Sequence, residues 1–259
     1  MQGVHLSAQS PLRRMHTTSS EASVAHKNAL LQRRCERVSG LVRRRFITML
    51  AKCDDHGYYR AELCHVCNRK GKFLMSDKEL DRVGRVITGI LRHFPERFGV
   101  TLDEHGFVPV TDLVEDIKSR NRSFSCLKEE HVIALCETDE KGRYQIKDGR
   151  IRATYAHTID VDMSDLPEDA PEKLYYPASE EEAPMLLERG ITPMGQTYVH
   201  LSGTREKATE AGMVKNENPI ILEIDVKSMM ERGIGVYQAG KDVFLTKNVP
   251  AECVSGGES

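Results

Sequence analysis

The stretch from Ser76 to Val100 reads SDKELDRVGRVITGILRHFPERFGV and predicts the helix around which the rest of the chain is organised. Ser76, followed three residues later by Glu79, is the pattern of a capping box, in which each side chain accepts a hydrogen bond from a backbone N–H at the helix start. The apolar residues that follow recur at the spacing of one face of an amphipathic helix: Leu80, Val83, Ile87, Ile90 and Leu91. We expect the helix to stop before Pro95.

An arginine and a histidine stand side by side at the expected end of this helix, as Arg92 and His93. The arginine offers a fixed fork of cationic donors, and the histidine titrates near neutral pH. Such a pair suits a phosphate group on a nucleic acid. A solvated helix end is the alternative, and this stretch alone does not decide between the two.

Composition limits the class of protein and the kind of partner. A chain of 259 residues allows one large domain or two small ones. Its content of 39% hydrophobic and 29% charged residues is ordinary for a soluble protein, and no apolar run approaches the ~18 residues needed to span a bilayer. We therefore expect no membrane partner, and we expect a monomer. The formal net charge of −2 gives no overall basic field, so any nucleic-acid site must be a local patch.

The first 45 residues differ in composition from the rest. Residues 1–45 hold nine Lys and Arg but only two acids, and they contain no apolar core of a secretory signal. Three interpretations stay open: a basic tail that helps hold RNA, a transit-peptide-like leader, or an extension without a role. All three predict partial disorder, up to about residue 20. Some helical periodicity across residues 28–50 makes a helix possible there.

Two knuckle-like motifs follow, Cys53-Asp-Asp-His56 and Cys64-His-Val-Cys67. Seven cysteines without a secretory signal do not form the pattern of a disulfide framework, so we expect a cytoplasmic protein with thiols available for metal. Three thiolates and an imidazole suit zinc, and four protein ligands would make the site structural. We predict a zinc module over residues 46–75, with Cys53, His56, Cys64 and Cys67 as ligands. His65 is the substitute should His56 not bind.

The remaining chain divides into two halves of different pattern. Residues 76–160 show the order helix, short strands at Val100–Leu102 and Gly106–Val110, helices capped at Thr111 and begun near Leu127, then a hairpin turning at Asp148-Gly149. That order predicts a winged-helix module, a shape that commonly binds nucleic acid. Residues 161–173 are acidic and contain prolines, which indicates a linker. Residues 174–259 alternate short strands and helices, without a GxGxxG or Walker motif. The predicted fold class is α+β.

Five motifs in this order resemble the KptA family of RNA 2′-phosphotransferases, and the knuckles resemble a zinc module of its archaeal members. The motifs are GILRHFPERFGV (89–100), GRIRATYAHTIDVD (149–162), LYYP (174–177), GITPMGQTYVHLS (190–202) and VYQAGKDVFLTKNVPAE (236–252). The resemblance implies a winged-helix RNA lobe followed by an ADP-ribosyltransferase-like lobe that binds NAD. It also implies the removal of an internal 2′-phosphate from RNA, typically tRNA. The products expected are 2′-hydroxyl RNA, nicotinamide and ADP-ribose cyclic phosphate.

The resemblance also implies roles for single residues. Arg92, His93 and Arg152 match catalytic positions, and Lys215 stands near the place of a fourth catalytic arginine. Lysine supplies charge there but not a bidentate fork. The expected NAD contacts are His157, Tyr176, His200 and Ser202.

The same residues also have plainer interpretations. Arg152 can be an ordinary exposed strand residue, although it shares a strand face with Arg150 and so predicts a cationic stripe. His157 can simply hydrogen-bond the backbone, and His200 can be a packed strand histidine. The chain departs from many members at Tyr176-Pro177-Ala178 and at Gln196. Two other functions therefore stay open: an ADP-ribosyltransferase acting on another phosphate or nucleic-acid end, and a weakened protein that binds RNA and NAD.

Overall fold

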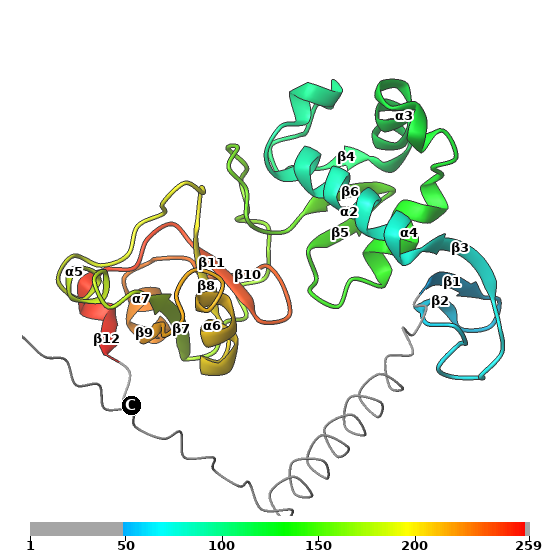
Figure 1. Cartoon of the computed structure of the whole chain (residues 1–259). Coiled ribbons are helices and arrows are strands. Elements are labelled where there is room, and N and C mark those ends of the chain that lie inside the picture. Colours follow the sequence, from blue (N-terminus) through cyan, green and yellow to red (C-terminus); the bar gives the residue numbers. More distant parts are fainter. Residues whose placement is uncertain (1–48, 257–259) are drawn as a thin grey trace, which may run out of the picture. The chain divides into compact units, whose positions relative to one another are not determined.

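A computed structural model describes residues 49–256, and Figure 1 shows their arrangement. The basic leader and most of the helix considered possible over residues 28–50 lie outside the described residues. Met49 and Leu50 belong to a strand instead, so the helix prediction is wrong at its end. Both side chains are buried, and burial in a sheet overrode the helical spacing.

A small antiparallel sheet begins the described chain and leads into the long helix (Figure 1). Its strands, in the order β2-β1-β3, are β1 (Met49–Cys53), β2 (Gly57–Arg60) and β3 (Lys72–Ser76). Tyr58 and Tyr59, between the two knuckles, predict a short strand, which is confirmed as β2, whereas β1 and β3 were not predicted. Leu50 and Met75 belong to the same buried cluster as the long helix, so the sheet and the helix share a core.

The long helix is α2 (Asp77–Arg92), and its predicted capping box is confirmed. The Ser76 N–H donates to Glu79 Oε2 at 2.9 Å, and the Glu79 N–H donates to Ser76 Oγ at 3.4 Å. The five residues of the predicted apolar face are all buried. Each such side chain contributes about 1.5–3 kcal/mol by leaving water, so this face fixes the rotation of α2.

Two α-helices, two short 3₁₀ helices and a second three-stranded sheet complete the first half. The elements are η1 (Pro95–Phe98), β4 (Val108–Pro109), α3 (Val110–Arg120), η2 (Arg122–Phe124), α4 (Glu129–Glu137), β5 (Tyr144–Lys147) and β6 (Arg150–Ala153), with strand order β4-β6-β5. The predicted hairpin turn is confirmed, since Asp148 and Gly149 have φ of 52° and 71°. No strand forms at Val100–Leu102. Thr111 lies inside α3, whose N-cap position is occupied by Pro109.

The second half is built on a six-stranded sheet of order β10-β11-β8-β7-β9-β12. Its elements are β7 (Lys173–Ala178), α5 (Ala183–Arg189), β8 (Val199–Ser202), α6 (Arg205–Gly212), β9 (Ile220–Asp225), α7 (Val226–Glu231), β10 (Tyr237–Gln238), β11 (Val243–Thr246), η3 (Ala251–Cys253) and β12 (Val254–Gly256). Strand β12 was not predicted, and it pairs with β9 at the sheet edge. The described residues thus form a mixed α/β architecture, and none of their helices has the length and apolarity to cross a membrane.

The acidic segment before β7 is anchored by apolar side chains. Residues 161–172 contain no helix or strand, as a linker would, but Val161, Met163 and Leu166 are buried. They pack in one cluster with Tyr198, whose hydroxyl oxygen accepts a hydrogen bond from the Met163 N–H at 3.1 Å. The segment therefore has a fixed path across the second half.

Two glycines with left-handed backbone offer a matched test of this fold. Gly190 has φ 81° and ψ −175°, and an added Cβ would lie 2.3 Å from the Val249 carbonyl oxygen. Gly233 has φ 74°, and its Cβ would meet nothing within 4 Å. Gly233→Ala should cost about 1 kcal/mol from backbone strain. Gly190→Ala should cost roughly 1–3 kcal/mol more, because backbone atoms must move.

Urea unfolding of both variants measures the difference. Equal unfolding free energies for the two variants would show that the close approach of Gly190 to Val249 does not constrain the fold.

Candidate functional site

The four predicted metal ligands lie together at the end of the small sheet. The ligand atoms of Cys53, His56, Cys64 and Cys67 are all within 4.8 Å of one another. Cys53 Sγ lies 3.4 Å from His56 Nδ1 and 3.7 Å from Cys67 Sγ. Tetrahedral zinc with Zn–S bonds of about 2.3 Å requires sulfur atoms about 3.7 Å apart, so the donor set fits zinc. The substitute His65 is not in the cluster and packs edge-on against Tyr59.

The second knuckle is shaped by its own backbone. The Asn68 N–H donates to the Cys64 carbonyl and the Cys64 N–H donates to the Arg69 carbonyl, at 2.8 and 3.0 Å. Asn68 takes the left-handed backbone that such a turn needs, with φ 55°. The backbone N–H of Arg69, and then its side chain, lower the pKa of the Cys67 thiol to about 6. The thiolate form that binds metal is therefore favoured near neutral pH.

Arg92 is a buried cation at the end of α2. Its side chain is 8% exposed, and its guanidinium carbon lies 4.6 Å from the centre of the Tyr155 ring. Nε and Nη2 are buried and have no hydrogen-bond partner among the described residues. Burial lowers the pKa of Arg92, because no carboxylate repays the loss of water around the charge. Unpaired buried donors on a cation are a strong indication of a place where an anion binds.

His157 lies at the centre of the predicted polar residues. It is 2% exposed, and its Nε2 is buried without a hydrogen-bond partner among the described residues. Its pKa is lowered to about 4, first by burial and then by four positive or titratable neighbours: Arg92, His200, Arg152 and His93. The structure therefore brings together side chains from α2, β6 and β8 around one imidazole.

A short segment, residues 155–158, connects this group to both halves. The Thr158 N–H donates to the Arg92 carbonyl at 2.9 Å, and Thr158 Oγ1 lies 3.0 Å from His93 Nδ1. The Ala156 N–H donates to His200 Nε2 at 2.9 Å. Ala156 has φ 65°, a strained left-handed conformation for a residue with a Cβ. With this backbone at Ala156, the ring of Tyr155 lies against the Arg92 guanidinium and the side chain of His157 is buried.

The expected cationic stripe of Arg150 and Arg152 is not observed. Arg152 is 1% exposed and donates to three acceptors: Gln145 Oε1 at 2.8 Å, the His105 carbonyl at 3.2 Å and Asp165 Oδ1 at 2.7 Å. Arg150 forms an ion pair with Asp103 at 2.9 Å. Two carboxylates thus neutralise the pair, and the plainer interpretation of Arg152 as an exposed strand residue is also wrong. The acids come from outside the hairpin, so the hairpin sequence gave no sign of them.

A cavity of about 480 Å³ opens over the six-stranded sheet and collects four predicted residues. Tyr176 comes from β7, His200 and Ser202 come from β8, and Lys215 follows α6. Burial lowers the pKa of His200 to about 4 and raises that of Tyr176. Gln196, the departure noted in the sequence, also lines this cavity.

Tyr155 is a site residue that the sequence analysis missed. It lies under the Arg92 guanidinium and also lines the cavity that contains His200. The only sequence signal was its position in the motif GRIRATYAHTIDVD, midway between Arg152 and His157. Tyr155 therefore joins the unpaired cation to the cavity over the sheet.

Comparisons with known proteins agree with the resemblance drawn from the five motifs. A family model described as RNA 2′-phosphotransferase, Tpt1/KptA family, matches residues 78–248. A Methanosarcina barkeri protein named probable RNA 2′-phosphotransferase is 44% identical over 204 residues, covering 79% of this chain and 97% of the relative. A protein of the same name from Thermoplasma acidophilum is 43% identical over 204 residues, covering 78% and 86%. One from Archaeoglobus fulgidus is 41% identical over 202 residues, covering 78% and 92%.

Metal binding is tested by two cysteine substitutions. Cys64→Ser removes a buried member of the cluster, whereas Cys126→Ser removes an exposed thiol outside it. Cys64→Ser should lose equimolar zinc and lower the melting temperature by roughly 5–10 °C, because the small sheet has little core of its own. Cys126→Ser should keep both its zinc and its melting temperature. Full zinc content in purified Cys64→Ser, measured by mass spectrometry, would refute the ligand set.

The buried histidines predict acid sensitivity. An unfolded histidine titrates near 6.5, whereas His157 and His200 titrate at about 4 in the folded protein. As pH falls between these values, the unfolded chain binds protons that the folded chain does not, so the free energy of unfolding decreases. The full effect is about 3 kcal/mol per histidine.

The pH effect is measured by denaturant unfolding between pH 7 and pH 4. His157→Asn should reduce the dependence on pH, and comparing it with the wild-type slope removes the contribution of metal release common to both proteins. Identical slopes would mean that His157 is accessible to protons in the folded state.

Proposed function

The chain belongs to the RNA 2′-phosphotransferase, Tpt1/KptA family, and from this premise we propose that it is a transferase that removes an internal 2′-phosphate from RNA with NAD as co-substrate. We further propose tRNA as the RNA, as the resemblance implies. The single observation that carries the proposal is that Nε and Nη2 of Arg92 and Nε2 of His157 are buried without hydrogen-bond partners among the described residues. Buried donors on a cation that lack partners suit a phosphate, which supplies acceptors and negative charge together.

The reaction needs positioning and charge neutralisation. In the proposed first step, an oxygen of the RNA 2′-phosphate attacks the ribose carbon that bears nicotinamide, and the carbon–nitrogen bond breaks with its electron pair leaving on nicotinamide. In the second step, a ribose hydroxyl attacks phosphorus, the bond to the RNA 2′-oxygen breaks, and that oxygen takes a proton. The anionic phosphate and the dinucleotide must be held together, which is a task for fixed arginine donors.

Each group of residues receives a part in this proposal. Arg92, with His93 held by Thr158, binds the 2′-phosphate. Arg152 lies near His157 but is tied to Asp165, so it acts from a fixed position. We propose the 480 Å³ cavity as the place of NAD, with Tyr176, His200, Ser202 and Lys215 on its walls. The ammonium group of Lys215 contributes one positive charge there, but it cannot form the bidentate hydrogen bonds of an arginine.

The finer description of the two halves also belongs to this proposal. We propose that residues 76–160 act as a winged-helix RNA lobe, supported by their helices and the β5–β6 hairpin. We propose that residues 174–259 act as an ADP-ribosyltransferase-like lobe, supported by the cavity over the six-stranded sheet. Zinc is proposed as a structural ion in the small sheet, where the four ligands meet.

Arg92 is the residue to change first. Arg92→Ala should lower kcat/KM on a 2′-phosphorylated oligonucleotide by about 10²–10³, because the transition state loses a fixed donor pair. Arg92→Lys should recover little, since the ammonium cannot reproduce the fork. Arg82→Ala is the matched control, because Arg82 lies on the same helix and stacks on Phe124.

The assay follows phosphate transfer with and without NAD, and the melting temperature of each variant reports folding. Loss of phosphate from the RNA in the absence of NAD would contradict the proposal that NAD is the co-substrate. Full activity of a folded Arg92→Ala variant would remove Arg92 from the site.

A further inference from the structure

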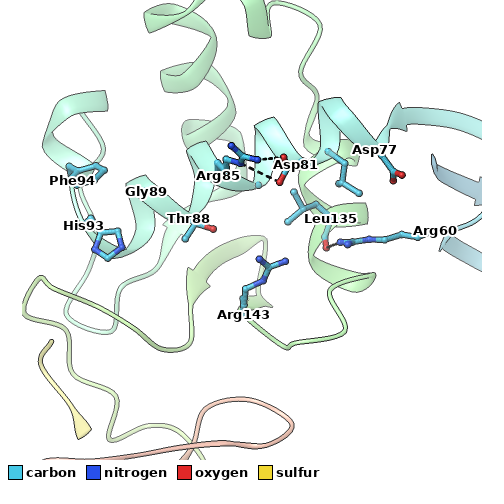
Figure 2. A pocket seen from close by; sticks show the side chains of 12 residues that line it. Arg60, Asp77, Asp81, Arg85, Thr88, Gly89, His93, Phe94, Leu135 and Arg143 are labelled. Carbon is cyan, nitrogen blue, oxygen red and sulfur yellow. Dashed lines mark hydrogen bonds and ion pairs between the residues drawn. The ribbon is translucent and has the colours of Figure 1, made fainter. Parts of the chain in front are cut away.

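A second cavity, of about 620 Å³, lies between α2 and residues of β2, α4 and the start of the hairpin, and of its lining only His93 has a part in the function proposed so far (Figure 2). His93 and Phe94 line one end, and Asp77 and Arg60 line the other. It shares no lining residue with the cavity over the six-stranded sheet. Because His93 follows Arg92 directly, the cavity begins beside the proposed phosphate site and leads away from it.

Small residues on α2 create this hollow. Gly84, Thr88 and Gly89 lie on its wall, and an added Cβ on Gly84 would meet only Leu135 Cδ1, at 3.7 Å. The Thr88 hydroxyl lies 2.5 Å from that of Tyr144, so the wall is also hydrogen-bonded to the hairpin. Glycine in the interior of a helix costs about 1 kcal/mol relative to alanine. In α2 this loss of stability coincides with open space beside Gly84, which a larger side chain would fill.

Three arginines from separate elements reach the cavity: Arg60 from β2, Arg85 from α2 and Arg143 from the residue before β5. Arg143 is held by the buried Asp139, with Nε 3.0 Å from Oδ1. Arg85 pairs with Asp81 one turn away. Arg60 donates to Thr138 Oγ1 at 2.8 Å and to the Leu135 carbonyl at 3.2 Å. Both acceptors of Arg60 are uncharged, so these bonds fix its direction without offsetting its charge.

Arg60 is placed by the zinc-binding sheet. Glu130 on α4 accepts from Lys52 of β1 at 3.2 Å and from Lys72 of β3 at 2.9 Å, which fastens the small sheet to α4. The guanidinium of Arg60 then reaches the last turn of the same helix. The sheet that holds the metal cluster therefore contributes one wall of the cavity.

We propose that this cavity binds the stretch of RNA next to the 2′-phosphorylated nucleotide, with Arg60 of the metal-binding sheet as one of its phosphate contacts. The proposal rests on the proposed function, since it extends that substrate from the same site. Fixed arginines suit backbone phosphates. Asp81 and Thr88 add carboxylate and hydroxyl oxygens that suit the ribose hydroxyls and base amino groups of the same RNA chain. A simple anion would find that carboxylate repulsive, whereas a nucleotide chain offers both donors and acceptors.

Two variants and two substrates test the proposal. Arg60→Ala removes the cation, and Gly84→Met fills the hollow with a neutral side chain that favours helix more than glycine does. The substrates are a 2′-phosphorylated dinucleotide and the same dinucleotide extended by unpaired nucleotides on both sides. Each variant should lower the ratio of kcat/KM for the long substrate to that for the short one by about tenfold. Arg82→Ala, whose side chain lies outside the cavity, is the control for loss of charge.

Direct binding separates this proposal from the proposed function. Fluorescence anisotropy with the long RNA lacking the 2′-phosphate needs no turnover, and Arg60→Ala should weaken binding and reduce the salt slope by about 1. Zinc content and melting temperature confirm that the variant keeps its fold. Equal losses on the short and long substrates, or unchanged RNA binding, would overturn the cavity proposal. A wild-type protein that converts neither substrate would overturn the proposed function, and the anisotropy result would still decide the cavity.

Discussion

A buried positive charge without a counter-charge is the constraint on which the site depends. Arg92 is withdrawn from water by the same rotation of α2 that buries Leu91 and Ile90 beside it. The Tyr155 ring recovers part of the lost solvation through a cation–π contact, which contributes about 1–2 kcal/mol when desolvated. The remaining cost is met elsewhere in the fold, by the apolar face of α2. Core packing and the proposed phosphate site therefore depend on one helix, and a change that rotated α2 would affect both.

The metal cluster and the long helix act as one structural unit. Strand β3 runs straight into the capping box of α2, and Leu74 and Met75 of that strand lie in the core of the first half. The small sheet has few buried residues of its own, so its shape depends on the cluster of four ligands. A metal bound there, as proposed, would fix the start of α2, while the segment 155–158 holds its end.

Local sequence signals predicted what depends on neighbours in the chain. The capping box at Ser76, the turn at Asp148-Gly149 and the four ligands each depend on residues close together in the chain, and all were found in the structure. Strand β12 pairs with β9 far back in the chain, so it left no local signal and was missed. Strands β1 and β3 were also missed, and they pair with each other across the two knuckles. The enclosure of Arg152 depends on Asp165, which belongs to a segment that composition alone marked as a linker. The function was inferred from five sequence motifs in a fixed order. The buried atoms of Arg92 and His157 that lack partners are seen only in the three-dimensional structure.

The hydrogen bond from the Ala156 N–H to His200 has a consequence for how the two proposed sites are linked. Residues 155–158 touch the proposed phosphate site through Arg92 and the proposed NAD cavity through Tyr155 and His200. A shift of this one segment would therefore alter both sites together. Any coupling of binding free energies that passes through it is reciprocal: a change that bound RNA made in the affinity for NAD would be matched by the same factor in the affinity for RNA.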